Sequence, residues 1–463
     1  MIEMGVEKGD RVALLLPNCP EFVIIYFGIA KIGGIVVPLN IRYKLDELAS
    51  LFNDSQPKVL IAESHSLGLL ISALPRFGYI EHIIDLDDKY PGQFISYHRV
   101  MTTSSARRVE VALEPEDTAV IIYTSSPTVN PRGVALSHRS LVTEAAISAD
   151  GFQQTDKDKI ILFALPMHHA MGLVGVLLST IYTGGTVIVV PGLSIKGVME
   201  TIERERGTLF MGVPYIYALM VDMAEKDGIE SDLSSLRLWG SAGAPLSHGI
   251  IRRFKQHFGM DLIDFWGLTE AACHCTCPPV DGTGKFGSVG KVLSGWELKI
   301  VDDNGRALPT NQRGEIIVKG PIMQGYYNKL QATAAPIKNG WLYTGDIGRV
   351  DEDGYLFILG RKKEMIIQKG QNIYPGDIEA VLKTHPKVAE TAVVGVPDEL
   401  RGEIVRAYIS LKRGEVATEE GIKHFCLEHM ANYKVPKQIV FLESLPKTTT
   451  GQIRKEDLKR LSS

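Results

Sequence analysis

Apolar and polar residues alternate along the first half of the chain in short strand-like and longer helix-like blocks. The block EFVIIYFGIAKIG (21–33) has the apolar spacing of a helix. Apolar runs bounded by Gly, Pro or charged residues are typical of buried strands. Such runs are VALLLP (12–17), IVVPL (35–39), KVLIA (58–62), TAVIIYTS (118–125) and LRLWGSAGAPLS (236–247). Strands that alternate with helices predict βαβ units and a parallel sheet.

The stretch from Ile160 to Ile195 contains no Asp, Glu, Lys or Arg and raises the question of a membrane span. A spanning helix requires about 20 consecutive apolar residues. Pro166, the pair His168–His169, Gly184–Gly185 and Pro191 interrupt this stretch. We therefore expect two buried strands, IILFAL and TVIVV, with a buried helix between them, and no transmembrane segment.

The second half of the chain changes character twice. From about Ser294, the short runs ELKIVDDNG, GEIIVKG and YLFILG are typical of a small barrel or sheet of antiparallel character. After GRKKE (360–364), the segments DIEAVLKTHP, ETAVVGVPDE and EIVRAYISLK predict a compact α+β unit. The predicted fold is α/β. It has a large N-terminal domain of parallel-type sheets over residues 1–359, with a β-rich subdomain at about 294–359, a hinge at 360–364 and a small C-terminal α+β domain over 365–463.

Composition and charge exclude several classes of protein. With 463 residues, 45% of them hydrophobic, the chain can bury a large core in more than one domain. A net charge of −4 gives no electrostatic basis for nucleic-acid binding. Five cysteines in so long a chain form no disulfide framework, and MIEMGVEKGDR has no apolar signal-peptide segment, so a reducing cytoplasm is expected. Cys273, Cys275 and Cys277 alternate beside His274 but lack a second ligand cluster, which argues against zinc.

Four longer motifs narrow the class further: FWGLTE (265–270), WLYTGDIG (341–348), GRKKEMIIQKGQNIYPGDIE (360–379) and LPKTTTGQIRK (445–455). In this order they resemble the superfamily of adenylate-forming (ANL) enzymes, which includes AMP-binding acyl-CoA synthetases, firefly luciferase and the adenylation domains of peptide synthetases. Matching blocks begin at Gly9–Asp10–Arg11 and so cover nearly the whole chain. Relatives usually carry a further segment before GVEKGDR, so this chain is expected to be short at that end.

The resemblance implies a two-step reaction. A carboxylic acid first attacks the α-phosphate of ATP in the presence of Mg²⁺, which expels pyrophosphate and leaves an acyl-adenylate. The thiolate of coenzyme A then forms the thioester, after a mobile C-terminal domain has rotated. Such a site must bind base and ribose, neutralise phosphate charge and hold the carboxylate in line.

Several residues are expected at the nucleotide. Asp346, in the turn YTGD, offers two acceptor oxygens for a ribose diol, although Asp after Gly is commonly an Asx-turn residue. By resemblance, Asp346 and Arg361 contact the ribose, Thr269 contacts the α-phosphate and Glu270 ligates Mg²⁺. Trp266 replaces the family's tyrosine on the adenine and keeps a flat face, with core packing as its alternative role.

The segment GSAGAPLS (240–247) resembles the strand end that lies along the adenine and the acyl group, where small residues permit close approach. Gly243 and Ala244, together with Gly267 of FWGLTE, are expected near the nucleotide. The resemblance places His169, Val213 and Gly240 at the acyl pocket, although a histidine in an apolar run is more often a satisfied core residue.

The segments that resemble the pocket wall are His169–Leu173, Met211–Pro214 and Trp239–Ala244, and none contains Asp, Glu, Lys or Arg. A second carboxylate buried there would be unpaired, which is costly. The acid is therefore expected to be uncharged and largely apolar, with aliphatic (fatty) acids ahead of simple aromatic ones.

The phosphate loop, YTSSPTVNPRGV (123–134), departs from the family pattern. By resemblance, the loop amides cradle the β- and γ-phosphates. Ser126 and Val129 replace two glycines, and Pro127 removes an amide donor, so weaker phosphate binding is expected. The groups that remain for phosphate are Thr124, Ser125, Thr128 and the cation of Arg132.

A second departure lies near the C-terminus. Gln452, in Gly451–Gln452–Ile453, stands where the family has its catalytic lysine. Gln452 can donate a hydrogen bond but has no charge. Loss of one preorganised stabiliser of transition-state charge costs on the order of 10²–10³ in rate. Lys447 and Lys455 flank this position and are the alternative cations.

The thioester half resembles the family more fully. Lys363 stands at the pivot of the hinge, although a lysine in most chains is only a solvated charge. The loop KGQN (369–372) would line the pantetheine tunnel, with Gly370 leaving room for the thiol arm. The segment ANYKVP (431–436) also matches.

Two classes of function follow. The first is an AMP-forming acyl-CoA ligase, an acid–thiol ligase of fatty acid metabolism that uses ATP, Mg²⁺ and coenzyme A. The second is a degenerate homologue that binds nucleotide or acyl groups with little adenylation activity, or that accepts preformed acyl-adenylate. A carrier-protein phosphopantetheine is an alternative acceptor to coenzyme A, and a luciferase-like oxygenase is only weakly excluded. The sequence specifies neither the acid nor the oligomeric state.

Overall fold

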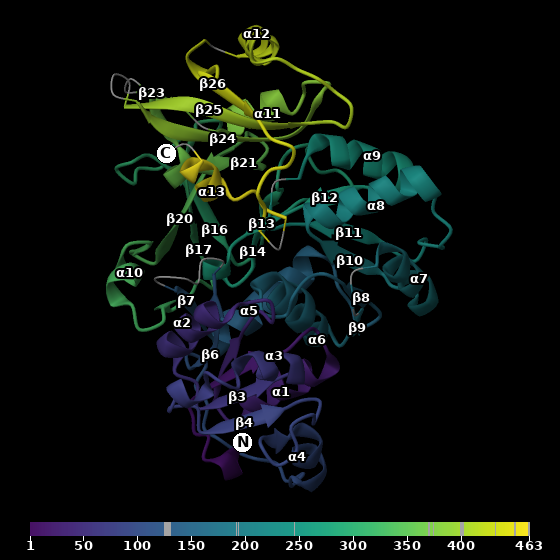
Figure 1. Cartoon of the computed structure of the whole chain (residues 1–463), viewed down its shortest axis with the longest axis vertical. Helices are drawn as coiled ribbons and strands as arrows, with labels where there is room; N and C mark the ends of the chain where they lie inside the picture. Colours follow the sequence, from purple (N-terminus) through teal and green to yellow (C-terminus); the bar gives the residue numbers. More distant parts are fainter. Residues whose placement is uncertain are drawn as a thin grey trace. The chain divides into compact units, whose positions relative to one another are not determined.

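Figure 1 shows the chain in a computed structural model that describes residues 1–124, 131–190, 192, 194–244, 246–368, 371–373, 375–398, 402–430, 432–448 and 451–461. Of Lys363, Ile367, Gln371, Asn372 and Tyr433 it describes the backbone alone. The chain divides into two units, which are Met1–Glu297 with Val318–Leu342, and Leu298–Ile317 with Tyr343–Ser463. The predicted domain limits at residues 359 and 364 stay a prediction.

The first unit contains a sheet with the strand order β18-β7-β6-β2-β1-β3-β4-β5. Its strands are β1 (Arg11–Leu15), β2 (Ile35–Pro38), β3 (Val59–Ala62), β4 (His82–Asp85), β5 (Ile95–Ser96), β6 (Thr118–Tyr123), β7 (Gly133–Ser137) and β18 (Gly325–Tyr326). All neighbours from β6 to β5 pair in parallel, whereas β7 pairs antiparallel with β6 and with β18. The connecting helices are α1 (Pro20–Lys31), α2 (Leu45–Ser55), α3 (Ser64–Leu70) and α4 (Tyr97–Thr103).

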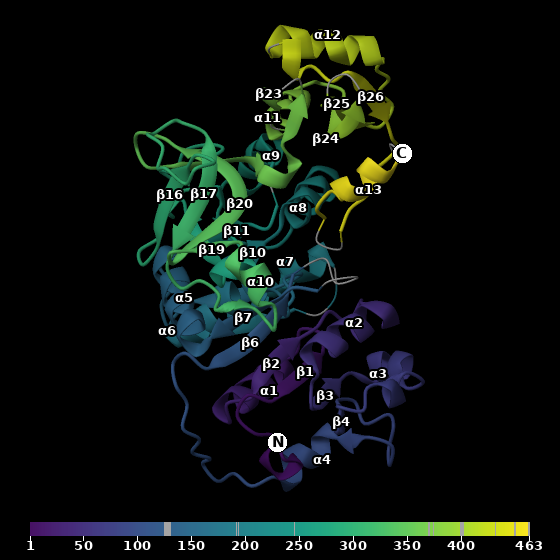
Figure 2. The same cartoon turned by 90° about the vertical axis from the view of Figure 1, so that its left-hand side faces the viewer.

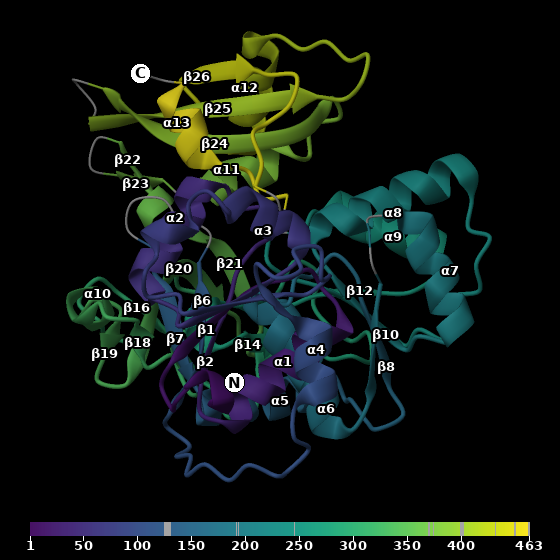
Figure 3. The same ribbon diagram turned by 60° about the horizontal axis from the view of Figure 1, so that its bottom comes forward.

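A second parallel sheet of this unit has the order β12-β11-β10-β8-β9. Its strands are β8 (Lys159–Leu162), β9 (Thr186–Val189), β10 (Leu209–Gly212), β11 (Leu238–Ser241) and β12 (Leu262–Asp264). Figure 3 shows the helices α7 (Ile195–Glu205), α8 (Pro214–Asp227) and α9 (His248–Phe258) beside it. Both sheets bury their central strands on both faces, which explains the continuous apolar runs in the sequence. The predicted α/β fold with parallel sheets is confirmed.

The charge-free stretch forms β8, a helical segment with a buried first part, and β9, in the predicted order. The prediction that TVIVV is a buried strand is wrong, because β9 lies at the edge of its sheet with Thr186 exposed and Val187–Val189 only partly buried. The helical segment begins as a π-helix, η3 (Met171–Leu178), and continues as α6 (Ser179–Thr183); both pack against α5 (His138–Gly151). A Cβ on Gly175 would come within 2.4 Å of the His274 ring, so a glycine allows η3 to approach β14 (His274–Cys277) closely. Among the described residues, no helix is both long enough and apolar enough to cross a bilayer.

Helices α4, α5, α7, α9 and α12 (Glu419–His429) each begin after a Ser or Thr whose hydroxyl accepts a backbone N–H of the first turn. Such caps stabilise a helix by about 0.5–2 kcal/mol. A small antiparallel sheet, β13 (Trp266–Gly267), β14 and β15 (Lys291–Val292), follows β12. Its first strand holds the middle of the FWGLTE motif.

The second unit contains most of a five-stranded sheet. Figure 2 shows its strands β16 (Glu297–Val301), β17 (Gly314–Lys319), β20 (Trp341–Val350) and β19 (Ile337–Lys338), and the fifth strand is β21 (Leu356–Arg361). Strand β20 pairs antiparallel with β19 and β21. A short helix, α10 (Leu330–Ala334), precedes β19. Of the two alternatives predicted for the chain from Ser294 onward, a small barrel or a sheet of antiparallel character, the structure has the sheet.

The rest of the second unit is an α+β arrangement. Its sheet comprises β22 (Ile366–Gln368), β23 (Gln371–Ile373), β24 (Val388–Asp398), β25 (Gly402–Leu411) and β26 (Gln438–Phe441). Helices α11 (Pro375–Leu382) and α12 pack through Ile378 and Ile422 into the core on one face. On the other face, α13 (Lys455–Arg460) packs through Leu458 beside Tyr408, whose hydroxyl donates to the Leu458 carbonyl at 2.9 Å.

Candidate functional site

The phosphate loop is the connection of a β-hairpin in the first unit. Strands β6 and β7 pair antiparallel up to Tyr123 and Gly133, and the Thr124 N–H donates to the Arg132 carbonyl at 3.3 Å. The Arg132 side chain is exposed, and its guanidinium carbon lies 5.4 Å from the centre of the Tyr326 ring. The predicted phosphate contacts Ser125 and Thr128, and the substitutions at Ser126, Pro127 and Val129, lie outside the described residues.

The FWGLTE motif turns sharply between two paired strands. Trp266 is 9% exposed on β13, and the pairing with β14 shifts register at Trp266–Gly267. A Cβ on Gly267 would stand 1.6 Å from the Cys273 carbonyl oxygen, so only glycine fits there. Thr269 and Glu270 follow in a short 3₁₀ turn, η4 (Thr269–Ala271), where both are half-buried. The motif thus presents a hydroxyl and a carboxylate at one turn.

Glu270 contacts a residue that the sequence analysis missed. The Tyr326 hydroxyl donates to Glu270 Oε1 at 2.8 Å, and the Met323 N–H donates to the Glu270 carbonyl at 2.8 Å. Tyr326 is 8% exposed, and burial and the neighbouring Glu270 carboxylate raise its pKa. Tyr326 follows Gly325 on β18, which lies beside β7 in the sheet. No local pattern marks this tyrosine, because its contacts come from strand pairing between distant segments.

The predicted adenine and acyl segments lie at the carboxyl ends of the second parallel sheet, where open α/β sheets usually bind ligands. Gly240 packs closely against Met211, because a Cβ on Gly240 would lie 2.4 Å from the Met211 sulfur. Gly243 has a left-handed φ of +84° and faces Val213, which caps α8. Ala244 follows, half-buried.

Asp264 is a second residue that the sequence analysis missed. It ends β12 beside Ser241 of β11, and its carboxyl accepts the Leu246 N–H. Burial raises the pKa of Asp264 to about 8. The signal in the sequence was a lone carboxylate two residues before Trp266 in an apolar strand. Because it is protonated at neutral pH, it adds no negative charge to this end of the sheet.

His169 lies two residues before η3, whose N-cap is Ala170. Its carbonyl accepts the Leu173 N–H at 2.9 Å, and its ring centre is 4.5 Å from that of His168. Burial lowers the pKa of both histidines, so both are neutral at physiological pH. A neutral, largely buried imidazole is compatible with an apolar pocket wall.

The alternating cysteines beside His274 pack into the core. His274 Nδ1 is 2.9 Å from the Ser148 hydroxyl, and burial lowers its pKa to about 3. The buried Glu144 accepts the His274 N–H at 2.7 Å and the Trp296 indole N–H at 3.1 Å. Burial raises the pKa of Glu144 to about 8. Within the described ranges, no group of three His, Cys, Asp or Glu side chains is arranged to hold a metal ion.

In the second unit, Asp346 and Arg361 lie opposite each other. They pair across β20 and β21, and Arg361 Nε is 2.6 Å from Asp346 Oδ1. The Asp346 side chain is 4% exposed and that of Arg361 is 50% exposed. The predicted turn at YTGD is wrong: Gly345 has a left-handed φ of +72°, but the strand continues through Asp346. The pair presents a buried acceptor beside an accessible cation.

Gln452 lies at an exposed turn of the second unit. The Thr448 N–H donates to the Gln452 carbonyl at 2.7 Å, and Gly451 has a φ of +84°. Both flanking lysines form ion pairs with carboxylates of the same unit. Lys447 Nζ contacts Glu390 at 2.5 Å, and Lys455 Nζ contacts Glu364 and Glu379 at 2.9 and 2.8 Å.

Lys455 is the more strongly held of the two lysines. Its side chain is 17% exposed, and although burial lowers its pKa, the carboxylates of Glu379 and Glu364 raise it overall. Of the predicted hinge and tunnel residues, Lys363 is described by its backbone in η5 (Lys362–Glu364), and Gly370 lies outside the described residues. Near this hinge, Arg313 Nη1 contacts Asp377 at 2.6 Å.

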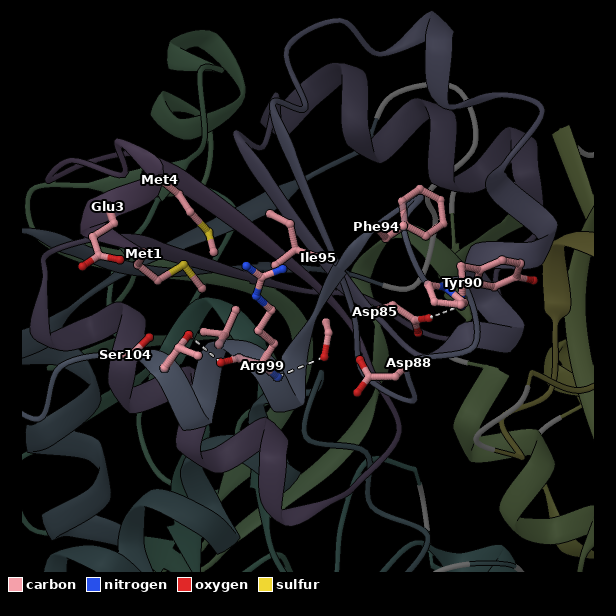
Figure 4. A pocket seen from close by; sticks show the side chains of 15 residues that line it. Met1, Glu3, Met4, Asp85, Asp88, Tyr90, Phe94, Ile95, Arg99 and Ser104 are labelled. Atoms are coloured by element: carbon pink, nitrogen blue, oxygen red, sulfur yellow. Dashed lines mark hydrogen bonds between the residues drawn. The ribbon is translucent and has the colours of Figure 1, made fainter.

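The first unit also contains a cavity of about 640 Å³ beside β4, β5 and α4 (Figure 4). Asp85, Tyr90 and Arg99 line it, and the Asp85 carboxylate accepts the Tyr90 N–H at 3.0 Å. None of the residues predicted for the site lines this cavity.

The predicted residues of the first unit suit a magnesium nucleotide. Mg²⁺ in such sites is usually held by one or two carboxylates together with substrate phosphates. Glu270 supplies one carboxylate: Oε1 accepts Tyr326, and Oε2 accepts no hydrogen bond from the described residues. Arg132 supplies a cation for phosphate oxygens.

Comparison of the chain with known proteins shows the family to which it belongs. Residues 1–327 match the family model of the AMP-binding enzyme, and residues 377–452 match that of the AMP-binding enzyme C-terminal domain. A long-chain-fatty-acid–CoA ligase of Bacillus subtilis is 34% identical over 98% of this chain and 86% of its own length. An indoleacetate–CoA ligase of Aromatoleum aromaticum is 35% identical over 99% of this chain and 89% of its own. ATP-bound MatB from Rhodopseudomonas palustris superposes with a TM-score of 0.91 at 30% identity, over 99% of this chain and 90% of the other.

Proposed function

We propose that this chain, which belongs to the family of AMP-binding enzymes, is an AMP-forming acyl-CoA ligase. A carboxylate oxygen of the acid bonds to the α-phosphorus of ATP while the bond to the bridging oxygen of pyrophosphate breaks. The sulfur of coenzyme A then bonds to the acyl carbon, and AMP leaves. The two relatives described above carry names of this activity, which supports the proposal.

The observation that carries the proposal is the pair of Asp346 and Arg361. A buried carboxylate suits the two hydroxyls of a ribose, and the cation at 2.6 Å fixes its orientation. Arg361 is half-exposed, so its guanidinium remains able to contact the same sugar. We assign nucleotide binding to this pair, with Trp266, Gly267, Gly243 and Ala244 at the adenine.

For the phosphates we assign Thr269 to the α-phosphate and Arg132, with Thr124 at the base of the loop, to the outer phosphates. Glu270 would hold Mg²⁺, which supplies charge neutralisation at the phosphates. These groups act by position and charge, because phosphoryl chemistry needs electrostatic stabilisation more than covalent participation. Lys363 and Gly370 are assigned to the thioester step.

The acid is proposed to be uncharged and largely apolar. His169, Val213 and Gly240 carry no charge at neutral pH, and Asp264 is protonated there. A second carboxylate of the substrate would therefore remain unpaired. We place aliphatic acids ahead of aromatic ones. Coenzyme A is the proposed acceptor, with a carrier-protein phosphopantetheine as the alternative.

One specific observation favours a second candidate, a homologue with slow adenylation. Gln452 carries no charge, and both flanking lysines are engaged in ion pairs. Such a protein would still accept preformed acyl-adenylate. The two candidates differ in a single property, which is the rate of the ATP-dependent step.

The test is pyrophosphate release and thioester formation from ATP, coenzyme A and a panel of acids from acetate to palmitate, with benzoate and malonate included. A ligase produces both products with at least one acid. A clear preference for malonate would contradict the apolar pocket. Thioester formed from preformed acyl-adenylate and coenzyme A, but not from acid, ATP and coenzyme A, would select the second candidate.

A further inference from the structure

We propose that Tyr326 is a positioning residue that holds the Glu270 carboxylate and the Arg132 guanidinium in place for the magnesium nucleotide. The inference rests on the proposed function, since it assigns a role within the same site. It concerns a residue that touches neither the acid nor the nucleotide in the proposed roles. Tyr326 would act through its two neighbours.

The Tyr326 side chain contacts both charged groups: burial and Glu270 raise the pKa of its hydroxyl, and Arg132 lowers it. Its hydroxyl donates to Glu270 Oε1 at 2.8 Å, and its ring lies under the Arg132 guanidinium at 5.4 Å. A cation within about 6 Å of a ring centre is attracted by the negative face of the ring. One side chain thus connects the carboxylate after the FWGLTE motif with the cation at the end of the phosphate loop.

The backbone around Tyr326 reinforces this connection. The Met323 N–H donates to the Glu270 carbonyl at 2.8 Å, and the Tyr327 N–H donates to the Gly133 carbonyl at 2.7 Å. Lys329 Nζ donates to the Pro131 carbonyl, and the Tyr326 N–H donates to the Thr333 hydroxyl at 2.8 Å. The segment Met323–Lys329 therefore holds Glu270 at one end and the residues on either side of Arg132 at the other.

The arrangement matters because both held groups carry charge. A carboxylate with one oxygen fixed by a hydroxyl keeps its rotamer, which leaves the second oxygen directed for a cation. An exposed arginine has many rotamers, and a ring beneath it reduces the entropy lost when phosphate binds. Electrostatic groups act best when they are already oriented before the reaction.

Tyr326→Phe removes the hydroxyl, and with it the hydrogen bond to Glu270, and keeps the ring beneath Arg132. Binding of the non-cleavable α,β-methylene analogue of ATP is measured by calorimetry as a function of Mg²⁺, without acid. We expect Tyr326→Phe to raise the Mg²⁺ concentration for half-saturation about tenfold, as fits one lost hydrogen bond to a charged group. Tyr326→Leu should in addition weaken the Mg²⁺-independent affinity, and this extra loss should vanish in an Arg132→Gln background.

Two controls separate positioning from general destabilisation. Tyr79→Phe removes another tyrosine hydroxyl of the same unit, which donates to Asn53 at 2.9 Å, and should leave Mg²⁺ dependence unchanged. In a Glu270→Ala background, Tyr326→Phe should add no further effect, because its partner is gone. A structural role would instead give additive losses and a lower melting temperature.

The outcomes separate this inference from the proposed function. The role of Tyr326 is overturned if Tyr326→Phe needs the same Mg²⁺ concentration for half-saturation as the wild type. It is also overturned if the effects of Tyr326→Phe and Glu270→Ala on nucleotide binding are additive. A wild-type protein that binds the magnesium nucleotide but forms no adenylate and no thioester overturns the ligase and leaves the binding test of Tyr326 intact. Failure of the wild type to bind the nucleotide overturns both.

Discussion

Replacement of Gln452 by lysine should accelerate the ATP-dependent step on the order of 10²-fold and leave the thioester step unchanged. One preorganised stabiliser of transition-state charge contributes about 2.7–4 kcal/mol, which corresponds to 10²–10³ in rate. Gln452 is exposed at its turn, so the substitution itself should change stability by no more than about 0.5 kcal/mol. The effect should therefore be almost entirely on rate.

The structure also decides which flanking lysine could already supply that charge. Lys455 is 17% exposed between two carboxylates at 2.9 and 2.8 Å. Removing a partner from such a buried pair costs about 3–5 kcal/mol, which cancels the catalytic gain. Lys447 contacts Glu390 in a pair with side chains 32% and 37% exposed, and exposed pairs contribute only about 0–1 kcal/mol. Lys447 is therefore the only one of the two that could leave its partner at small cost.

The assay compares pyrophosphate release from acid and ATP with thioester formation from preformed acyl-adenylate and coenzyme A. Gln312→Lys is the matched control, because it adds the same charge at another exposed glutamine of the second unit. We expect acceleration with Gln452→Lys alone. The reasoning would be refuted if the wild type reacted equally fast from acid and ATP and from preformed acyl-adenylate, and if Lys447→Gln abolished the ATP-dependent reaction. Lys447 would then supply the charge that Gln452 lacks.

Three further predictions follow from single contacts. Asp346→Ala should weaken ATP binding by calorimetry at least tenfold, because a charge-assisted hydrogen bond contributes about 1.5–3 kcal/mol; unchanged affinity would remove Asp346 from the site. Gly267→Ala should lower the melting temperature and the adenylation rate, since its Cβ would stand 1.6 Å from a carbonyl oxygen, whereas Gly78→Ala, with nothing within 4 Å, should do neither. Burial raises the pKa of Glu144 from 4.5 to about 8, so its protonated form stabilises the fold below pH 4.5 and this contribution is lost as pH rises towards 8. Denaturant titrations across this range should show a flatter pH profile for Glu144→Gln, and an unaltered slope would contradict the buried-acid assignment.

Sequence reasoning predicted the fold well where burial is uniform. Strands β1, β2 and β3 are covered on both faces, so their apolar runs gave their positions within about two residues. The charge-free stretch was also predicted correctly as two strands around a helix, but the burial of its second strand was not, because β9 lies at the edge of its sheet. The π-helical start of this helix was not predicted, and neither was the close approach of Gly175 to His274, which is distant in sequence.

The residues proposed for the site come from sequence motifs, whereas their contacts with one another do not follow from those motifs. Asp346 and Arg361 come from neighbouring motifs, and strand pairing brings them together. Tyr326 and Asp264 were missed, because their contacts depend on pairing between β18 and β7 and on the position of Leu246 beside β12. Local periodicity carries no information on which distant strands become neighbours.

The ion pairs around Lys363 have a mechanical consequence. Lys455 contacts Glu364, which follows Lys363, and Glu379 of α11, so these three residues would travel as one body if the chain rotates about Lys363. Arg313 precedes Lys363 in the chain and Asp377 follows it, so a rotation about Lys363 would have to break their contact at 2.6 Å. Arg313 is 42% exposed, and dissolved salt screens exposed charges. Added salt would therefore weaken the Arg313–Asp377 contact before it weakens the contacts of the more buried Lys455 with Glu364 and Glu379.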